Sequence, residues 1–84
     1  MYTVILTAQA EKDLKKLSRI VLERIANSLR TLQENPRPMG VKKLQGEKDA
    51  YRVRAGDYRI VYRIVDQEVL VVVIKIAHRR EVYR

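Results

Sequence analysis

The sequence predicts a single α+β domain whose elements follow the order β-α-α-β-β-β. Apolar residues recur every three or four positions over residues 8–34, a spacing typical of amphipathic helices. Over residues 51–74 the period changes to two, which is typical of strands. One segment with proline and glycine, residues 35–40, separates the two patterns. Because the chain has only 84 residues, we expect one compact domain over residues 1–84.

The first half of the chain predicts a strand followed by two helices. Residues 2–6 form a β-branched run that indicates a short strand, and Thr7 is placed to cap the helix that follows. A second helix should begin near Ser18 and end before Pro36. Its apolar face consists of Val21, Leu22, Ile25, Leu29 and Leu32. We expect the two helices to form an antiparallel hairpin.

The second half predicts three strands, over residues 51–54, 58–63 and 69–74. Residues 55–57 and 66–68 have the composition of tight turns. Neighbouring strands should therefore pair as antiparallel hairpins.

Four arginines occupy alternate positions of the first two of these strands. Alternation places Arg52 and Arg54 on one face of their strand, and Arg59 and Arg63 on one face of theirs, without fixing which faces align. An ordinary solvent-exposed sheet face could show the same alternation. However, both strands use arginine rather than the usual mixture of Lys, Glu and Thr, and this favours an anion-binding surface.

The charge balance points to a polyanionic ligand. The chain has 18 Lys and Arg against 10 Asp and Glu, a net charge of +8. It has no cysteine and one histidine, with no carboxylate pair at ligand spacing, so we expect neither a metal site nor another cofactor. The apolar N-terminal run is too short for a signal sequence, and no segment approaches the roughly 20 apolar residues of a membrane span. We therefore expect a cytoplasmic protein that does not enter membranes.

Three segments occur in a characteristic order: Tyr51-Arg52-Val53-Arg54, Gly56-Asp57-Tyr58-Arg59-Ile60-Val61-Tyr62 and His78-Arg79-Arg80-Glu81-Val82-Tyr83. With Pro36, Lys43-Leu44 and Gly46, they resemble the RelE/ParE toxin superfamily over essentially the whole chain. The resemblance implies a helical hairpin packed on one face of a twisted antiparallel sheet. It also implies the toxin of a type II toxin–antitoxin system, but the fold alone does not decide the activity.

Two activities occur in this superfamily. RelE-type members are ribosome-dependent endoribonucleases that cut mRNA in the A site of the 30S subunit, whereas ParE-type members poison DNA gyrase and lack the cleavage residues. Metal-independent RNA cleavage needs a base for the attacking 2′-hydroxyl, cations for the developing charge and an acid for the leaving 5′-oxygen. The joint presence of Arg59, Arg79 and Tyr83 favours the RelE-type activity, with mRNA, rRNA and the ribosome as partners.

The resemblance also implies roles for four candidate catalytic residues. Arg59 and Arg79 match family arginines that stabilise the scissile phosphate, and a guanidinium suits two phosphate oxygens at once. Tyr83 matches a tyrosine that stacks on a base or accepts the 2′ proton. The ordinary tyrosine pKa, about 10, would have to be lowered by nearby cations. His78 is the only histidine, and an imidazole suits both proton transfers near neutrality.

Further basic residues are expected to bind RNA phosphates. Arg52 and Arg54 lie where RelE has two lysines, so the charge is kept while a side chain that deprotonates more readily is lost. The full set of expected phosphate-binding residues is Lys43, Arg52, Arg54, Arg63 and Arg80.

The implied partner is a cognate acidic antitoxin whose helical segment covers the basic sheet in a hetero-oligomer. Two alternatives to the RelE-type nuclease stay open. One is a ParE-like inhibitor of DNA gyrase. The other is a catalytically decayed toxin that acts as an antitoxin-bound corepressor, because the chain ends at Arg84 without the final helix of RelE.

Overall fold

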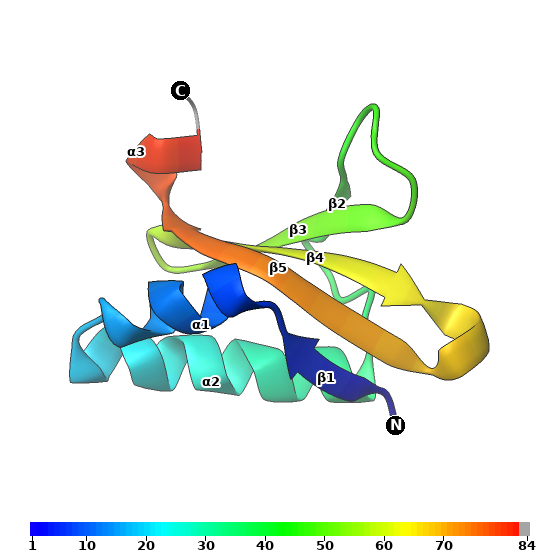
Figure 1. Ribbon diagram of the computed structural model, residues 1–84, viewed down its shortest axis with the longest axis horizontal. Coiled ribbons are helices and arrows are strands. Elements are labelled where there is room, and N and C mark those ends of the chain that lie inside the picture. Colours follow the sequence, from blue (N-terminus) through cyan, green and yellow to red (C-terminus); the bar gives the residue numbers. More distant parts are fainter. Residues whose placement is uncertain (83–84) are drawn as a thin grey trace.

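Two helices cover one face of a five-stranded sheet in the computed structural model, which describes residues 1–82 and the side chains of residues 1–80 (Figure 1). The elements are β1 (Thr3–Leu6), α1 (Ala8–Lys15), α2 (Arg19–Glu34), β2 (Lys42–Lys43), β3 (Ala50–Ala55), β4 (Tyr58–Val65), the 3₁₀ helix η1 (Asp66–Glu68), β5 (Leu70–His78) and α3 (Arg79–Val82). The strands lie in the order β1-β5-β4-β3-β2. The α+β class and the helical hairpin are confirmed.

The sheet is antiparallel from β5 to β2, as expected, and β1 adds a parallel edge. Thr3 lies opposite Leu70 and Leu6 opposite Val73. The helical hairpin and the other strands lie between these two strands in sequence, so local turn signals could not indicate this pairing. Strand β2 was also not expected, because two residues are too few to show a period.

Helix α1 begins at the expected capping residue, Thr7, and α2 begins after Ser18, near which the sequence placed its start. The hydroxyl of Thr7 accepts a hydrogen bond from the Ala10 amide at 3.1 Å and donates one to the Ile74 carbonyl at 2.8 Å. The Ser18 hydroxyl accepts from the Val21 amide at 3.3 Å. These bonds satisfy amides at the helix starts, and Thr7 also fastens α1 to the sheet.

The hydrophobic core lies between the helices and one face of the sheet. Its buried members are Ala10, Ile25, Leu32, Ala55, Ile60, Tyr62, Ile64, Val71, Val73 and Ile76. The register between β4 and β5 shifts at Val61 and Tyr62, which lie opposite Lys75 and Val73. Ile74 is thus an extra residue in β5, and this bulge lets both Val73 and Ile76 point into the core.

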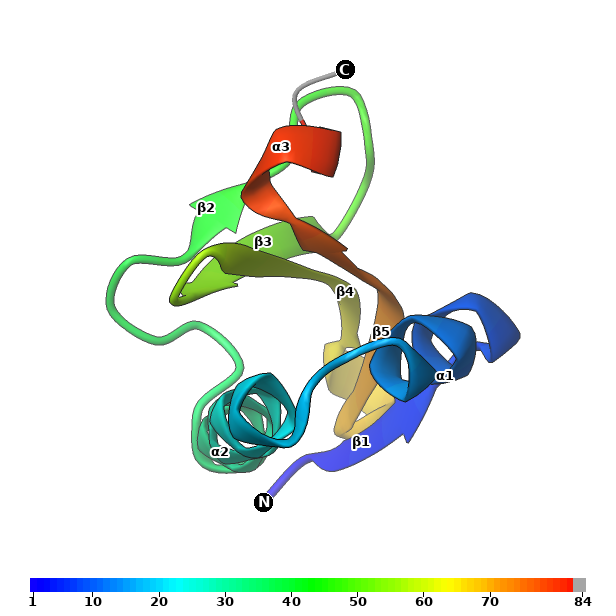
Figure 2. The ribbon, with the colours of Figure 1, turned by 90° about the vertical axis from the view of Figure 1, so that its left-hand side faces the viewer.

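We call the opposite face of the sheet, away from α1 and α2, the open face. Figure 2 shows α3 on this side of the sheet. No helix among residues 1–82 is both long enough and apolar enough to cross a membrane.

The segment before β2 is fixed to the rest of the fold through Asp66. Arg37 donates two hydrogen bonds to its carboxylate, at 2.8 and 3.2 Å, and the Tyr2 hydroxyl donates a third at 2.7 Å. Arg37 and Tyr2 lower the pKa of Asp66, because their bonds favour the ionised carboxylate. The Tyr62 hydroxyl donates to the Pro36 carbonyl at 2.7 Å. Residues 36–37 are therefore held against the sheet.

Val69 has an unfavourable backbone conformation, with φ 51° and ψ 48°. A β-branched residue is strained in this left-handed region, whereas asparagine tolerates it. We expect Val69→Asn to raise the free energy of unfolding by about 1 kcal/mol in urea denaturation. The matched control Val69→Ile keeps the β-branch and should give no gain. Equal stability of the two variants would contradict the interpretation.

The Asp66 network should make stability depend on pH. A carboxyl whose pKa is lower in the folded state contributes stability above its unfolded pKa, about 3.9, and loses it as pH falls through the folded value. We expect Asp66→Asn to lower the Tm at pH 7. The Tm difference from wild type should shrink as the pH is lowered below about 4. A difference that stays constant down to acid pH would show that the charge of Asp66 is not what matters.

Candidate functional site

Two arginines lie directly opposite one another on the open face. Arg54 of β3 is the register partner of Arg59 of β4. Opposed residues of antiparallel strands project from the same face, with Cβ atoms roughly 4.5–5.5 Å apart. The same register places Arg52 opposite Val61, and Arg63 opposite Ala50. The sequence pattern did not show which faces of β3 and β4 align, and the register now does: all four strand arginines project from the open face.

A cavity of about 110 Å³ adjoins the opposed pair, and we call it the arginine cavity. Its lining residues are Arg54, Gly56, Asp57, Tyr58, Arg59 and Arg79. A water-sized group needs roughly 10–15 Å³ of such space, so the cavity has room for the oxygens of a phosphate. Arg59 is only 2% exposed, whereas Arg54 and Arg79 are exposed. The site therefore combines one buried guanidinium with two that solvent can reach.

The turn between β3 and β4 brings Arg79 to this pair. The amide of Arg79 donates a hydrogen bond to the Asp57 carbonyl at 2.7 Å, which fixes the start of α3 beside the turn. Gly56 has a φ of +63°, and a Cβ there would lie 3.0 Å from Nη1 of Arg24 in α2. The positive φ favours glycine at this position, whereas the flexible end of the Arg24 side chain can move aside. Residues distant in sequence thus surround one small space.

Three guanidinium groups around one cavity suit an anion. Like charges directly opposite in a sheet repel one another, so binding of an anion between Arg54 and Arg59 is favoured. Guanidinium groups bind phosphate through pairs of parallel hydrogen bonds. Fixed donors of this kind also stabilise negative charge that develops on phosphate oxygens during a reaction. The arrangement can therefore bind a phosphodiester and stabilise a more highly charged transition state.

The structure does not bring His78 into the arginine cavity. Ala77, not His78, lies opposite Arg59, so the alternation of β5 directs His78 to the other face. The imidazole meets the Tyr58 ring edge-on, with 5.2 Å between ring centroids. Its Nδ1 accepts a hydrogen bond from the Arg80 amide at 3.2 Å. His78 lines a separate hollow with Asp13, Lys16, Leu17, Tyr58 and Ile76.

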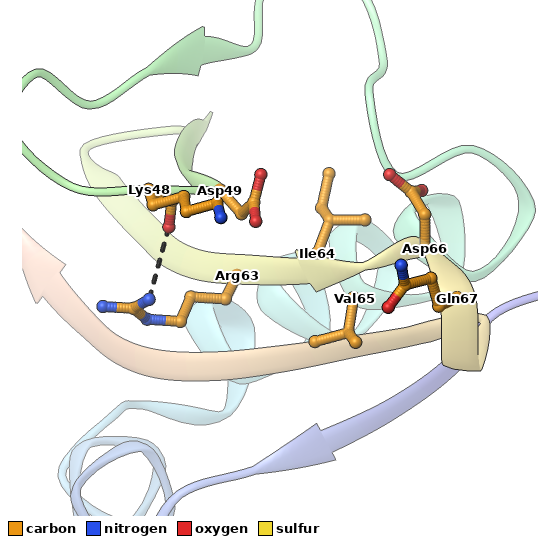
Figure 3. Close-up of a pocket in the computed structure, with 7 residues that line it drawn as sticks. All are labelled: Lys48, Asp49, Arg63, Ile64, Val65, Asp66 and Gln67. Atoms are coloured by element: carbon orange, nitrogen blue, oxygen red, sulfur yellow. Dashed lines mark hydrogen bonds between the residues drawn. The ribbon is translucent and has the colours of Figure 1, made fainter.

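Arg63 shares the open face but supports a loop. Its Nη2 lies 3.5 Å from Oε2 of Glu47, and its Nη1 donates to the Lys48 carbonyl at 3.2 Å (Figure 3). The surrounding hollow also contains the carboxylates of Asp49 and Asp66. Arg63 therefore holds the loop that precedes β3. Its hollow has two aspartates beside Arg63 and Lys48, whereas the arginine cavity has three arginines beside one aspartate, Asp57, and so suits a phosphate better.

The remaining candidates lie at the margins of the site. Lys43 is the register partner of Tyr51, while Lys42 is the partner of Arg52 and therefore belongs to the open face. The sequence pattern missed Lys42 because only the register of β2 distinguishes the two lysines. Arg80 is exposed in α3 and does not line the arginine cavity. Tyr83 lies outside the described residues.

Comparison with known proteins gives consistent matches over nearly the whole chain. The family model described as ParE toxin of type II toxin-antitoxin system, parDE, matches residues 4–83. The chain is 37% identical over 79 residues to the mRNA interferase toxin RelE of Escherichia coli, covering 89% of this chain and 82% of that protein. It is 33% identical over 84 residues to toxin RelG of Mycobacterium tuberculosis, covering 99% and 97% of the two chains. Among solved structures, the archaeal RelE–RelB complex from Pyrococcus horikoshii matches with a TM-score of 0.83 at 30% identity, covering 93% of this chain and 94% of that one.

The repulsion between Arg54 and Arg59 should be measurable as a stability change. We expect Arg54→Gln to raise the free energy of unfolding by about 0.5 kcal/mol at low ionic strength, because a like-charge pair is removed. The gain should vanish near 1 M salt, where the Debye length is about 3 Å. Lys75→Gln is the matched control, since Lys75 is exposed and lies opposite the uncharged Val61. Urea denaturation that gives both variants the same stability would contradict this interpretation.

Proposed function

Because the chain belongs to the ParE toxin family of type II toxin–antitoxin systems, within the RelE/ParE superfamily, we propose that it is an endoribonuclease of the mRNA interferase type. The proposal rests mainly on one observation: Arg54, Arg59 and Arg79 all line one cavity that has room for a phosphate. A relative named mRNA interferase, 37% identical to this chain, supports it.

The proposed reaction is metal-independent transesterification at the phosphate held in the arginine cavity. The ribose 2′-oxygen forms a bond to phosphorus, and the bond from phosphorus to the 5′-oxygen breaks. Negative charge grows on the phosphate oxygens, where Arg59 and Arg79 stabilise it. The 2′ proton passes to a base and the leaving 5′-oxygen takes a proton from an acid. Tyr83, which follows α3 in the sequence, is our candidate for the first transfer.

The cavity supplies charge stabilisation but little means of aligning a flexible RNA. In-line attack requires the 2′-oxygen, the phosphorus and the leaving oxygen to be held in one geometry, and such positioning is worth a large part of a barrier. We propose that the ribosomal A site holds the mRNA in this geometry and that the toxin adds its arginines. Activity would then depend on the ribosome.

We further propose that an acidic antitoxin silences the toxin by covering the open face. A similar structure is a complex of RelE with RelB, which supports a partner of this kind. Carboxylates of such a partner would neutralise the Arg54–Arg59 pair, and occupation of the open face would exclude RNA.

The nuclease proposal is tested in a reconstituted translation reaction with primer extension on the mRNA. Wild type should cut mRNA at A-site codons only when ribosomes are present. Arg79→Ala should reduce cleavage by on the order of 10²-fold, the usual effect of losing one transition-state donor. Arg19→Ala, on the helical hairpin, is the matched control and should cut normally. Arg59→Lys retains a cation at the buried position, so it tests the bidentate geometry with less risk to folding.

Intact mRNA with wild type would overturn the nuclease proposal. The matching family model bears the name of ParE, so DNA gyrase is then the next target to test. A supercoiling assay would show inhibition if the chain acts on gyrase. RNA binding with neither cleavage nor gyrase inhibition would indicate a decayed toxin.

A further inference from the structure

A further hollow, of about 370 Å³, lies on the side of β3 away from β4 and is lined by Met39, Gly40, Lys42, Arg52, Val53 and Arg54. We call it the Met39 hollow. It arises because β2 pairs only with Tyr51 and Arg52, which leaves Val53 and Arg54 beyond the end of β2. Before β2 the chain turns away at Gly40, whose φ is +89°.

The lining of this hollow combines cations with one exposed apolar side chain. Lys42 and Arg52 are register partners, so a like-charge pair again lies on the open face. Arg54 adds a third cation, and no carboxylate lines the hollow. Met39 is 100% exposed at its rim. This chemistry fits a ligand with both a phosphate and a flat apolar surface, because a thioether packs favourably on aromatic faces.

The Met39 hollow and the arginine cavity are neighbouring spaces that share one lining residue. Arg54 lines both spaces. Arg52 and Arg54 are two residues apart on one strand, roughly 6.6–6.8 Å along its axis. A strand of RNA with its reacting phosphate in the arginine cavity therefore brings a neighbouring nucleotide to the Met39 hollow.

The loop that carries Met39 is anchored at its start. The Tyr62 hydroxyl donates to the Pro36 carbonyl at 2.7 Å, and Arg37 binds Asp66 in a bidentate ion pair. The Val41 amide donates to the Pro38 carbonyl at 3.1 Å, closing the turn in which Met39 lies. Anchoring of this kind reduces the ordering cost when a ligand binds.

We propose that the Met39 hollow is a subsite for one single-stranded RNA nucleotide next to the phosphate held in the arginine cavity. Lys42 and Arg52 bind the phosphate of this nucleotide, and Met39 packs on the face of its base. The volume is in the range of small-molecule sites, which begin near 300 Å³. The assignment rests on the proposed function, since it takes RNA as the substrate, and it makes Met39 a determinant of which nucleotide lies beside the cut.

The test measures binding of a short single-stranded RNA whose 2′-hydroxyls are methylated to prevent cleavage. An abasic nucleotide is placed at each position in turn. At one position, loss of the base should weaken binding to wild type by about 2- to 10-fold, and the same loss should have no effect on Met39→Ala. Met39→Leu should retain part of the effect. Ile20→Ala, an exposed apolar residue on α2, is the matched control and should behave as wild type.

Salt dependence tests the phosphate contact. Lys42→Gln should reduce the slope of log affinity against log salt by about 0.7, the value per phosphate for a single strand. Equal abasic effects in wild type and Met39→Ala, or an unchanged slope for Lys42→Gln, would overturn the subsite. Tight binding of an acidic peptide without any abasic effect would do the same. Failure of ribosome-dependent cleavage while the Met39-dependent abasic effect persists would remove the proposed catalysis and leave the subsite standing.

Discussion

The opposition of Arg54 and Arg59 across β3 and β4 is the constraint on which the rest of the site depends. A protein with a net charge of +8 pays for this pair in stability, because both guanidinium groups project from one face and Arg59 is buried. The two paired strands are held in place by the opposite face of the sheet, where Ile60 and Tyr62 of β4 pack in the core beneath the helices. The same strands therefore supply the core on one side and a cluster of cations on the other, and an anionic ligand bound there reduces the repulsion between these cations.

The helices and strands that are long enough to show a periodic apolar pattern could be predicted from sequence. The features that depend on contacts between residues far apart in the sequence could not. The helix starts at Thr7 and Ser18 follow from local hydrogen bonds that a sequence signals directly. Strand β2 has two residues, and its pairing with β3 requires the loop at 44–49 to close. The parallel pairing of β1 with β5 joins the beginning of the chain to its end, and no local signal encodes it.

For the candidate site, residue type could be predicted more easily than residue direction. Arg59 and Arg79 were expected to act on the scissile phosphate and Arg54 to bind RNA phosphate, and the structure brings all three to one cavity. Ala77 lies opposite Arg59, so the next residue, His78, points to the other face of the sheet, away from the cavity. The bulge at Ile74 changes which residues of β5 face the core, and the sequence alone does not reveal this change. Lys42 and Lys43 differ in the same way. A shift of one residue in strand register leaves the sequence pattern unchanged, yet it decides on which face of the sheet a side chain lies.

The open face is not uniform, and its division bears on how a toxin of this family can be both active and silenced. The cations gather on β3 and β4, whereas the edge toward β1 presents apolar side chains such as Ile5, which is 45% exposed and lies opposite Val72. RNA carries phosphates and bases and would use the cationic part. An acidic amphipathic partner could use both parts, which would let it compete with RNA even though each ligand neutralises the same arginines. Under the proposed function, the repulsion between Arg54 and Arg59 favours binding of RNA and of the acidic partner alike. The apolar edge adds contacts that only the protein partner makes, so it raises the affinity of that partner over RNA. Silencing by occupation of the open face would need no rearrangement of the toxin fold.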